Sequence, residues 1–331
     1  MAARWSADHL KLHQQLLRQS NLLPKGAPLL LAVSGGQDSM AMAALLHDLR
    51  RLHHWRLQLW HGDHQLRGES GQQAKDLQAW AQREDLPLLL DRWEQPKPDE
   101  AAARRWRYRC LSRRAAELAI GHVLTAHTAT DKAETVILHA ARGSHRRGLA
   151  SLRQQRPLAP GITLVRPMLS FSRSDTSRIC DDLELPIWLD PSNEASHYSR
   201  NRVRHEVLPV LEQLHPGASK RLTSLSESLA QENEHLQELL DLAVTKIAHG
   251  PHQQHLQRRI LLSLHPVNQK ALLQSWLKRL SQERLHSQPM EQLLQALVQK
   301  NGGGEWSISR YATIQWSKNS IKLKITDHAE P

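Results

Sequence analysis

The chain has 331 residues, with 44 Lys and Arg against 33 Asp and Glu, and a formal net charge of +11 at pH 7. This length allows a large core and two domains, and the positive excess favours a polyanionic partner, with a merely basic soluble surface as the alternative. The two cysteines, Cys110 and Cys180, lie far apart and argue against a disulfide framework or a cysteine metal site.

The N-terminal segment, residues 1–17, is amphipathic and polar and lacks the uninterrupted apolar core of a signal peptide. No stretch of the chain approaches the length needed to cross a membrane. We therefore expect a cytoplasmic protein without a membrane partner.

The first predicted strand is the apolar run 29–33, and the next predicted helix covers 40–49. The loop between them reads Ser34-Gly35-Gly36-Gln37-Asp38-Ser39. Glycines let the backbone approach a ligand closely, and the amides of a helix N-terminus attract anions. The loop is therefore a candidate phosphate site, and an ordinary capped turn is the plainer alternative.

Residues 28–140 alternate between apolar strands and helical periodicity, with strands predicted near 29–34, 57–61, 88–93 and 123–126. This alternation predicts an α/β fold with a parallel, doubly wound sheet. Ligands of such sheets bind beyond the carboxyl ends of the strands. The chemistry is therefore expected in the polar segments after each strand, at 34–39, 61–70, 96–100 and 126–135.

The segment 162–209 is less regular, and we expect it to supply a last strand and loops that close the first domain. The turn at 215–217 predicts the boundary between an N-terminal catalytic domain, 1–215, and a smaller, mainly helical domain, 216–331. Helical spacing predicts a long helix over 222–247 and two more near 266–280 and 289–300. Alternation at 321–325 predicts a terminal β-hairpin with Lys322 and Lys324 on one face.

The loop at 34–39 differs from the Walker and GxGxxG patterns and resembles the pyrophosphate loop of the N-type ATP pyrophosphatases. These enzymes cleave ATP between its α and β phosphates and transfer AMP to an oxygen. The resemblance implies an ATP site. The implied ATP-binding residues are Ser34, Gly35, Gly36, Gln37, Asp38 and Ser39, of which Asp38 is also a catalytic candidate.

The run HGDHQLRGES, residues 61–70, resembles an element of the tRNA(Ile)-lysidine synthetase family within that group. The resemblance places His61 and Asp63 in the nucleotide pocket; two surface histidines before a helix are the plainer alternative. Gly62 stands where the family has an apolar residue, which suggests looser packing. Gln65 stands where it has a glycine, which raises the question of a positive φ there.

EAAARRWRY, residues 100–108, resembles the family element EAxARxxRY. On a helix, Glu100, Arg104 and Tyr108 share one face. The resemblance implies that Arg104 contacts ATP phosphates and Arg107 contacts tRNA, because a guanidinium grips phosphate oxygens in pairs. An exposed, ion-paired helix face is the alternative.

AHTATDKAET, residues 126–135, resembles the family pattern AHHxxDxxET. Asp131 and Glu134 are one helical turn apart and share a face. The resemblance assigns Mg²⁺ to Asp131, the incoming lysine amine to Glu134 and the nucleotide site to His127; dipole-complementing charges are the alternative. Thr128 stands where the family usually has a second histidine, so the role of that histidine is not carried over to Thr128.

Residues 142–149 resemble the family loop RGSGxxGL, with His145 in place of a glycine, while 190–193 and 200–204 match its DPSN and RNxxR elements. Arg142, Arg200 and Arg204 are therefore expected to contact tRNA, as are Lys322 and Lys324 on charge alone. In order, these elements extend the resemblance over roughly residues 28–209.

The resemblance implies a C–N ligase that adenylates the wobble cytidine of a tRNA(Ile) with a CAU anticodon, using ATP and Mg²⁺, after which free L-lysine displaces AMP. The product reads AUA instead of AUG. A tRNA thiolase of the same superfamily and a nonenzymatic RNA-binding protein on this scaffold are the alternatives. The sequence does not fix the oligomeric state, and a homodimer is among the states it allows.

Overall fold

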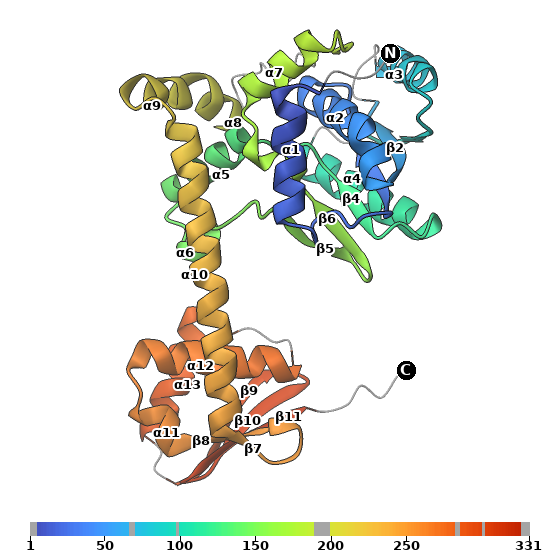
Figure 1. Cartoon of the computed structure of the whole chain (residues 1–331). Helices are drawn as coiled ribbons and strands as arrows, with labels where there is room; N and C mark the ends of the chain where they lie inside the picture. The colour runs from blue at the N-terminus through green and yellow to red at the C-terminus, as the bar shows by residue number, and fades with distance from the viewer. Residues whose placement is uncertain are drawn as a thin grey trace. The chain divides into compact units, whose positions relative to one another are not determined.

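The computed structural model describes residues 5–65, 70–96, 99–188, 199–281, 285–299 and 302–325. The chain divides into two compact units, Met1–Ala230 and Gln231–Pro331. Figure 1 gives the labels of the helices and strands. In the described part of the chain, no helix is both long enough and apolar enough to span a membrane.

The first unit is built on a sheet of six described strands in the order β3-β2-β1-β4-β6-β5. All neighbours pair in parallel except β5, which runs antiparallel to β6 at the edge. The predicted parallel sheet is confirmed, and its antiparallel edge strand was not anticipated. The strands are β1 (Pro28–Ala32), β2 (Arg56–Asp63), β3 (Leu88–Arg92), β4 (His122–Leu124), β5 (Gln155–Ala159) and β6 (Ile162–Val165).

Helices cover both faces of this sheet, as a doubly wound fold requires. Leu29 and Leu31 of β1 pack with α1, α2, α3 and α7 on one face, whereas Leu30 packs with α4 on the other. All three leucines are fully buried, because successive strand residues point to opposite faces and both faces are covered. The helices are α1 (Ala7–Arg18), α2 (Gln37–His53), α3 (Ser70–Arg83), α4 (Glu100–Glu117), α5 (Ala129–Ala141), α6 (Arg146–Leu149) and α7 (Arg173–Asp182).

The strand order reverses beside β1. The chain passes from β1 outward to β2 and β3, and then returns to place β4 on the opposite side of β1. At such a reversal the loops that follow two neighbouring strands diverge and leave a crevice beyond their carboxyl ends. The loop 33–36 after β1 and the residues 125–128 after β4 therefore border the same crevice.

The expectation of loops over 162–209 is wrong for most of the described part of this segment. Besides β6, it contains a 3₁₀ turn, α7 and several short helical elements. Ser172 caps α7 by accepting a hydrogen bond from the Asp175 amide, which is a local start signal that the sequence does contain. The remaining elements of this unit are η1 (Pro167–Ser170), α8 (Ser199–Arg202), the π-helical turn η3 (Val203–Val207) and α9 (Leu208–Leu214).

The long predicted helix is α10 (Ala218–Ile247), whose residues belong to both units. The second unit packs helices against an antiparallel sheet of five described strands in the order β7-β8-β11-β10-β9, so the predicted terminal hairpin, β10 and β11, belongs to a larger sheet. Its elements are β7 (Ala248–His249), η4 (Pro251–Gln253), β8 (His255–Gln257), α11 (Arg258–Ser263), α12 (Pro266–Ser281), α13 (Ser287–Gln299), β9 (Gly304–Ser309), β10 (Ala312–Trp316) and β11 (Ser320–Ile325).

Candidate active site

The loop between β1 and α2 is shaped for an anion. Gly35 has a φ of +87°, and a Cβ there would lie 2.8 Å from Trp188 Cε3, so a side chain is doubly disfavoured. The Ser39 hydroxyl accepts from the Ser34 amide at 3.1 Å and donates to the Gly36 carbonyl at 2.8 Å. Gly36, the N-cap of α2, offers no side-chain acceptor to the first helical turn. The Ser39 amide donates to the Gly36 carbonyl at 3.0 Å, whereas the amides of Gln37 and Asp38 have no described acceptor and are left for an external one such as a phosphate.

Helix α7 holds the carboxylate of Asp38. The Thr176 hydroxyl donates to Asp38 Oδ1, and Arg173 Nη1 donates to Oδ2 at 3.2 Å. Gln37 Nε2 also donates to the Arg173 carbonyl, at 2.8 Å, so α7 is fastened to the loop at two successive residues. Sequence reasoning missed Arg173 and Thr176 because they lie in the segment expected to be loop.

Asp38 also lies within reach of the negative charge of Asp131. Burial and the negative charge of Asp131 raise the pKa of Asp38, and these two effects outweigh the bonds from Thr176 and Arg173 that lower it. The first turn of α5 and the phosphate loop therefore place two carboxylates close together. The sequence motifs suggest that Asp38 and Asp131 belong to one site, but their spacing does not show that the two carboxylates interact.

The end of β2 brings His61 and Asp63 to the same edge of the sheet. His61 is buried, its Nδ1 lies 2.8 Å from the Val33 carbonyl, and burial lowers its pKa, so the imidazole is neutral. Asp63 accepts from the Gln65 amide at 2.9 Å, and Gln65 has a φ of +50°. The left-handed conformation that a glycine would favour is present at Gln65. The neighbouring residues 66–69 lie outside the described residues.

Tryptophan side chains fill the space beside Gly62. A Cβ at Gly62 would lie 2.5 Å from Trp60 Cη2 and 2.9 Å from Trp106 Cζ3. Trp106 stacks on Trp93 with a 5.6 Å centroid distance, and His64 meets its edge at 4.8 Å. The expected loosening at Gly62 is therefore wrong, because the rings occupy the volume that an apolar side chain would have taken.

Thr128 caps α5 and fixes Asp131. Its amide and hydroxyl donate to Asp131 Oδ2 at 2.8 and 3.0 Å, and the Asp131 amide returns a bond to the hydroxyl. Thr128 therefore has a structural role that its departure from the family pattern did not suggest. One turn later, Glu134 is fully buried in the same helix.

Two arginines from the segment after residue 198 bind this carboxylate pair. Arg200 donates from Nε to Glu134 Oε2 and from Nη2 to Asp131 Oδ1, both at 2.7 Å. Arg204 donates from Nε to Glu134 Oε1 at 2.6 Å and from Nη2 to Asp131 Oδ1 at 3.3 Å. The positive charge of Arg200 is the largest cause that lowers the pKa of Asp131 against its burial. Residues 190–193, the DPSN element, lie outside the described residues.

His127 lies beside the pair as a neutral imidazole. Burial lowers its pKa to about 3, helped by the charges of Arg166 and Arg107, while Asp131 acts in the opposite direction. Its Nδ1 lies 3.1 Å from the Thr125 hydroxyl. A neutral ring next to an ATP site can accept or donate one hydrogen bond without adding charge.

The other basic residues predicted to contact ATP or tRNA form no described hydrogen bond with Asp131 or Glu134. Arg104 is exposed on α4 and lies over the Tyr108 ring, and Arg107 is half-buried on the same helix. Arg142 is exposed at the C-terminal end of α5. Lys322 and Lys324 lie on β11 in the second unit, opposite Gln315 and Thr313 of β10.

The described residues contain no group of three or more His, Cys, Asp and Glu side chains placed to hold a metal ion. Asp38 and Asp131 form a pair, which matches the way Mg²⁺ is usually bound by one or two carboxylates together with substrate phosphates. The donor set thus suits Mg²⁺ carried with a nucleotide and not a metal held by protein alone.

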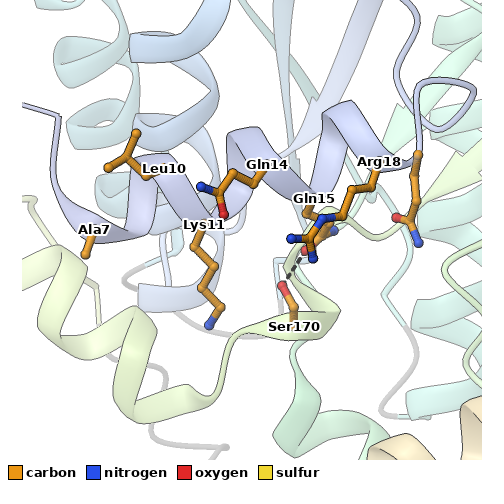
Figure 2. A pocket seen from close by; sticks show the side chains of 8 residues that line it. Ala7, Leu10, Lys11, Gln14, Gln15, Arg18 and Ser170 are labelled. Atoms are coloured by element: carbon orange, nitrogen blue, oxygen red, sulfur yellow. Dashed lines mark hydrogen bonds between the residues drawn. The ribbon is translucent and has the colours of Figure 1, made fainter.

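A surface hollow of about 490 Å³ lies along α1, as Figure 2 shows. Lys11, Gln14 and Arg18 line it, as do Gln15 and Ser170, whose hydroxyl donates to the Gln15 side chain. None of its lining residues belongs to the predicted site. Gln15 has a structural role here, because its Nε2 also donates to the Pro167 carbonyl at 3.0 Å and so connects α1 to η1.

Comparison with known proteins agrees with this geometry. Residues 9–211 match the family model of the PP-loop domain. The chain is 45% identical to a tRNA(Ile)-lysidine synthase of Parasynechococcus marenigrum over 329 residues, 98% of this chain and 96% of the relative. It is 41% identical to a tRNA(Ile)-lysidine synthase of Prochlorococcus marinus, over 96% of both chains.

Among solved structures, the U34-tRNA thiolase NcsA of Methanococcus maripaludis with its [4Fe-4S] cluster is similar in fold. The TM-score is 0.57 at 16% identity, with 67% of this chain and 79% of that chain covered. At this identity the similarity concerns the fold alone.

Proposed function

Since this chain belongs to the tRNA(Ile)-lysidine synthase family, we infer that it joins lysine to the wobble cytidine of a tRNA(Ile) with a CAU anticodon, at the expense of ATP. The match to lysidine synthases over nearly the whole chain carries this inference, and the action of the Asp131 charge on Asp38 beside the phosphate loop supports it. The reaction has two steps. The cytidine carbonyl oxygen attacks the α phosphorus of ATP and releases pyrophosphate, and the lysine ε-amine then displaces AMP from the ring carbon.

The phosphate loop supports the first step. The amides at the start of α2 are oriented to receive the β and γ phosphates, which leave as pyrophosphate. Asp38 and Asp131 would hold Mg²⁺, which supplies positive charge against the leaving pyrophosphate. Because Arg200 and Arg204 already occupy Oδ1 of Asp131, a cation there replaces or supplements a guanidinium donor.

Glu134 supports the second step. It is fully buried, and its oxygens already receive N–H donors from Arg200 and Arg204. A lysine ammonium presents the same kind of donor to the same oxygens. We propose that Glu134 orients the lysine ε-ammonium and accepts a proton from it, because only the neutral amine has a lone pair for attack.

The tRNA is proposed to bind the basic residues named from the sequence. Arg107, Arg142, Lys322 and Lys324 remain candidates for phosphate contacts. Arg200 and Arg204 are also retained, although their ion pairs with Asp131 and Glu134 support a primary role in holding the carboxylates.

A thiolase activity is disfavoured by the two cysteines. Cys110 packs in the core between the sheet and α4, whereas Cys180 packs in the core on the opposite face. Burial raises the pKa of both thiols, that of Cys180 to about 11, so neither is activated as a thiolate. The two sulfurs do not share a site in which a cluster or a persulfide could be exchanged.

The test is incubation of the protein with radiolabelled lysine, ATP, Mg²⁺ and a tRNA(Ile) transcript bearing CAU. Elongator tRNA(Met), which also bears CAU, is the matched control. Label in tRNA(Ile) alone is the expected result. Equal labelling of both transcripts would overturn the selectivity for tRNA(Ile). Release of pyrophosphate without labelled tRNA would indicate that a nucleophile other than lysine displaces AMP from the base.

A further inference from the structure

Four arginines converge on the side chain of Tyr108. The guanidinium carbons of Arg104, Arg107 and Arg156 lie 5.1, 5.4 and 5.0 Å from the centre of its ring. Arg166, at the end of β6, is close enough for its charge to help lower the pKa of the phenol. These residues come from α4, β5 and the end of β6, so they are brought together by the fold and not by one helix.

The positive charge of this cluster is not balanced by described acidic groups. None of the four arginines forms an ion pair with a described carboxylate. Arg166 is only 2% exposed, and among the described residues its Nε has no hydrogen-bond partner, nor have Arg107 Nε and the Tyr108 hydroxyl. Burying a cation without a counterion costs several kcal/mol, and leaving its N–H groups unpaired adds to that cost.

A buried arginine with a purely structural task looks different in this chain. Arg258, 3% exposed, donates to the carbonyls of Leu297, Gly302 and Ser317. Arg114 is likewise satisfied by the Asp91 carboxylate, at 2.8 Å. In the Tyr108 cluster, Arg166 Nη1 donates to the Arg153 carbonyl at 2.6 Å and Arg156 Nη1 donates to the Pro157 carbonyl at 2.9 Å. Nε of Arg107 and Nε of Arg166, in contrast, have no acceptor among the described residues, which leaves both free to donate to an acceptor from outside.

Given the proposed function, on which this inference rests, we propose that Arg107, Arg156 and Arg166 with Tyr108 form a second phosphate-binding site, separate from the loop at Ser34–Ser39. A phosphate offers several oxygens to the planar forks of two or three guanidinium groups and accepts the phenol hydrogen. Arg104 and Arg156 line the accessible side, since Arg104 is exposed and Arg156 half-buried.

The site adjoins the reacting groups. The charges of Arg107 and Arg166 both act on His127, which in turn interacts with Asp131. The phosphate has two sources with the same chemistry: a phosphodiester of the tRNA next to the target nucleotide, or the phosphate chain of ATP.

The experiment compares the full chain with Arg156→Gln and Arg166→Gln, and uses Arg109→Gln as the matched control. Arg109 is exposed on α4, and its replacement removes the same charge from outside the cluster. One arm measures the affinity for the tRNA(Ile) transcript over a series of salt concentrations, without ATP. The other measures the affinity for a non-hydrolysable ATP analogue, without tRNA. Neither arm requires lysine transfer, so a failure of the proposed function leaves this test intact.

We expect both cluster variants to lower the affinity for one of the two ligands at least about 5-fold. This loss corresponds to the removal of one charged hydrogen bond to a phosphate. If the ligand is tRNA, the logarithm of its binding constant should depend less steeply on the logarithm of the salt concentration. The slope for the cluster variants should be smaller by about 1 than the slope for Arg109→Gln. A weaker affinity confined to the ATP arm assigns the site to the nucleotide. Because the free cluster is self-repelling, Arg156→Gln without ligand should melt no lower than the parent. Unchanged affinities in both arms for folded variants would overturn the site.

Discussion

Arg204 grips Glu134 with both ends of its fork: Nε donates to Oε1 at 2.6 Å and Nη2 donates to Oε2 at 3.2 Å. Glu134 has no exposed surface, so its charge depends on such donors. The sequence pattern assigned Arg204 to tRNA, whereas the structure gives it a partner inside the protein. The most direct consequences concern stability and the order of the two chemical steps.

Replacing Arg204 with Ala should destabilise the first unit by about 1–3 kcal/mol, because a buried carboxylate loses one of its two guanidinium partners while Arg200 remains. Urea unfolding followed by tryptophan fluorescence measures the change. Arg202→Ala is the control, since Arg202 is exposed and its described ion pair is with the exposed Glu206. Equal stability of the two variants would mean that the Arg204 pair adds nothing to folding.

Glu134→Gln should separate the two steps. Removing the proton acceptor is expected to slow lysine transfer by about 10²–10⁴-fold. Pyrophosphate release, which depends on the phosphate loop and Asp38, should persist with tRNA and ATP. Parallel assays of labelled lysine in tRNA and of released pyrophosphate measure the two steps. Glu206→Gln, an exposed carboxylate on η3, should alter neither. Equal loss of both products would remove Glu134 from the second step.

Asp38→Asn should make the free protein more stable at pH 7 while abolishing adenylation. The folded pKa of Asp38 is raised above its ordinary value of 3.8, so its ionised form costs stability once the pH exceeds that ordinary value. Asn removes that cost, so the melting temperature at pH 7 should rise above that of the parent protein. Below pH 3.8 both side chains are neutral and the difference should vanish. A lower melting temperature at pH 7 would show that the Thr176 and Arg173 bonds dominate.

The sequence predicts the backbone elements of this protein better than it predicts the partners of the side chains in the site. Apolar runs such as 29–33 predicted the strands of the parallel sheet, and the glycines at 35 and 36 predicted the phosphate loop, because both signals are local. The ion pair between Glu134 and Arg200 joins residues 66 positions apart, and the bond between Asp38 and Thr176 spans 138. No local pattern specifies such partners; they follow from the packing of α7 and α8 against α2 and α5.

Gly62 offers a test of the aromatic packing. Gly62→Ala should cost about 1–3 kcal/mol, since its Cβ would lie 2.5 Å from Trp60 and 2.9 Å from Trp106. In the Trp60→Leu background the cost should fall, because the two positions compete for one volume. Gly71→Ala in α3 is the matched control: a Cβ there meets nothing within 4 Å, and a gain of about 0.5–1 kcal/mol is expected. Chemical denaturation gives the free energy of unfolding of Gly62→Ala, Trp60→Leu, their combination and Gly71→Ala. If the losses of the two single variants simply add in the combined variant, the alanine side chain at position 62 and the Trp60 ring do not compete for the same space.

The outward face of the second unit's sheet should bind tRNA through charge. Ile321 and Leu323 are buried, which confirms the predicted alternation and leaves Lys322 and Lys324 on the opposite face. Glu305 shares that face, because it and Lys322 both pair with Gln315. Lys322→Gln with Lys324→Gln should reduce the salt slope of tRNA binding by about 2, one for each phosphate that a lysine no longer neutralises.

Glu305→Gln removes a negative charge from the same row of side chains, so it should tighten binding at low salt where the lysine double variant weakens it. A binding titration at several salt concentrations compares the three proteins. The two variants should therefore change the tRNA affinity in opposite directions. Damage to the sheet would lower the affinity in both variants, whereas an electrostatic attraction of phosphates raises it in one and lowers it in the other. Weaker binding by Glu305→Gln, or an unchanged slope in the double lysine variant, would therefore move the tRNA contact away from this face.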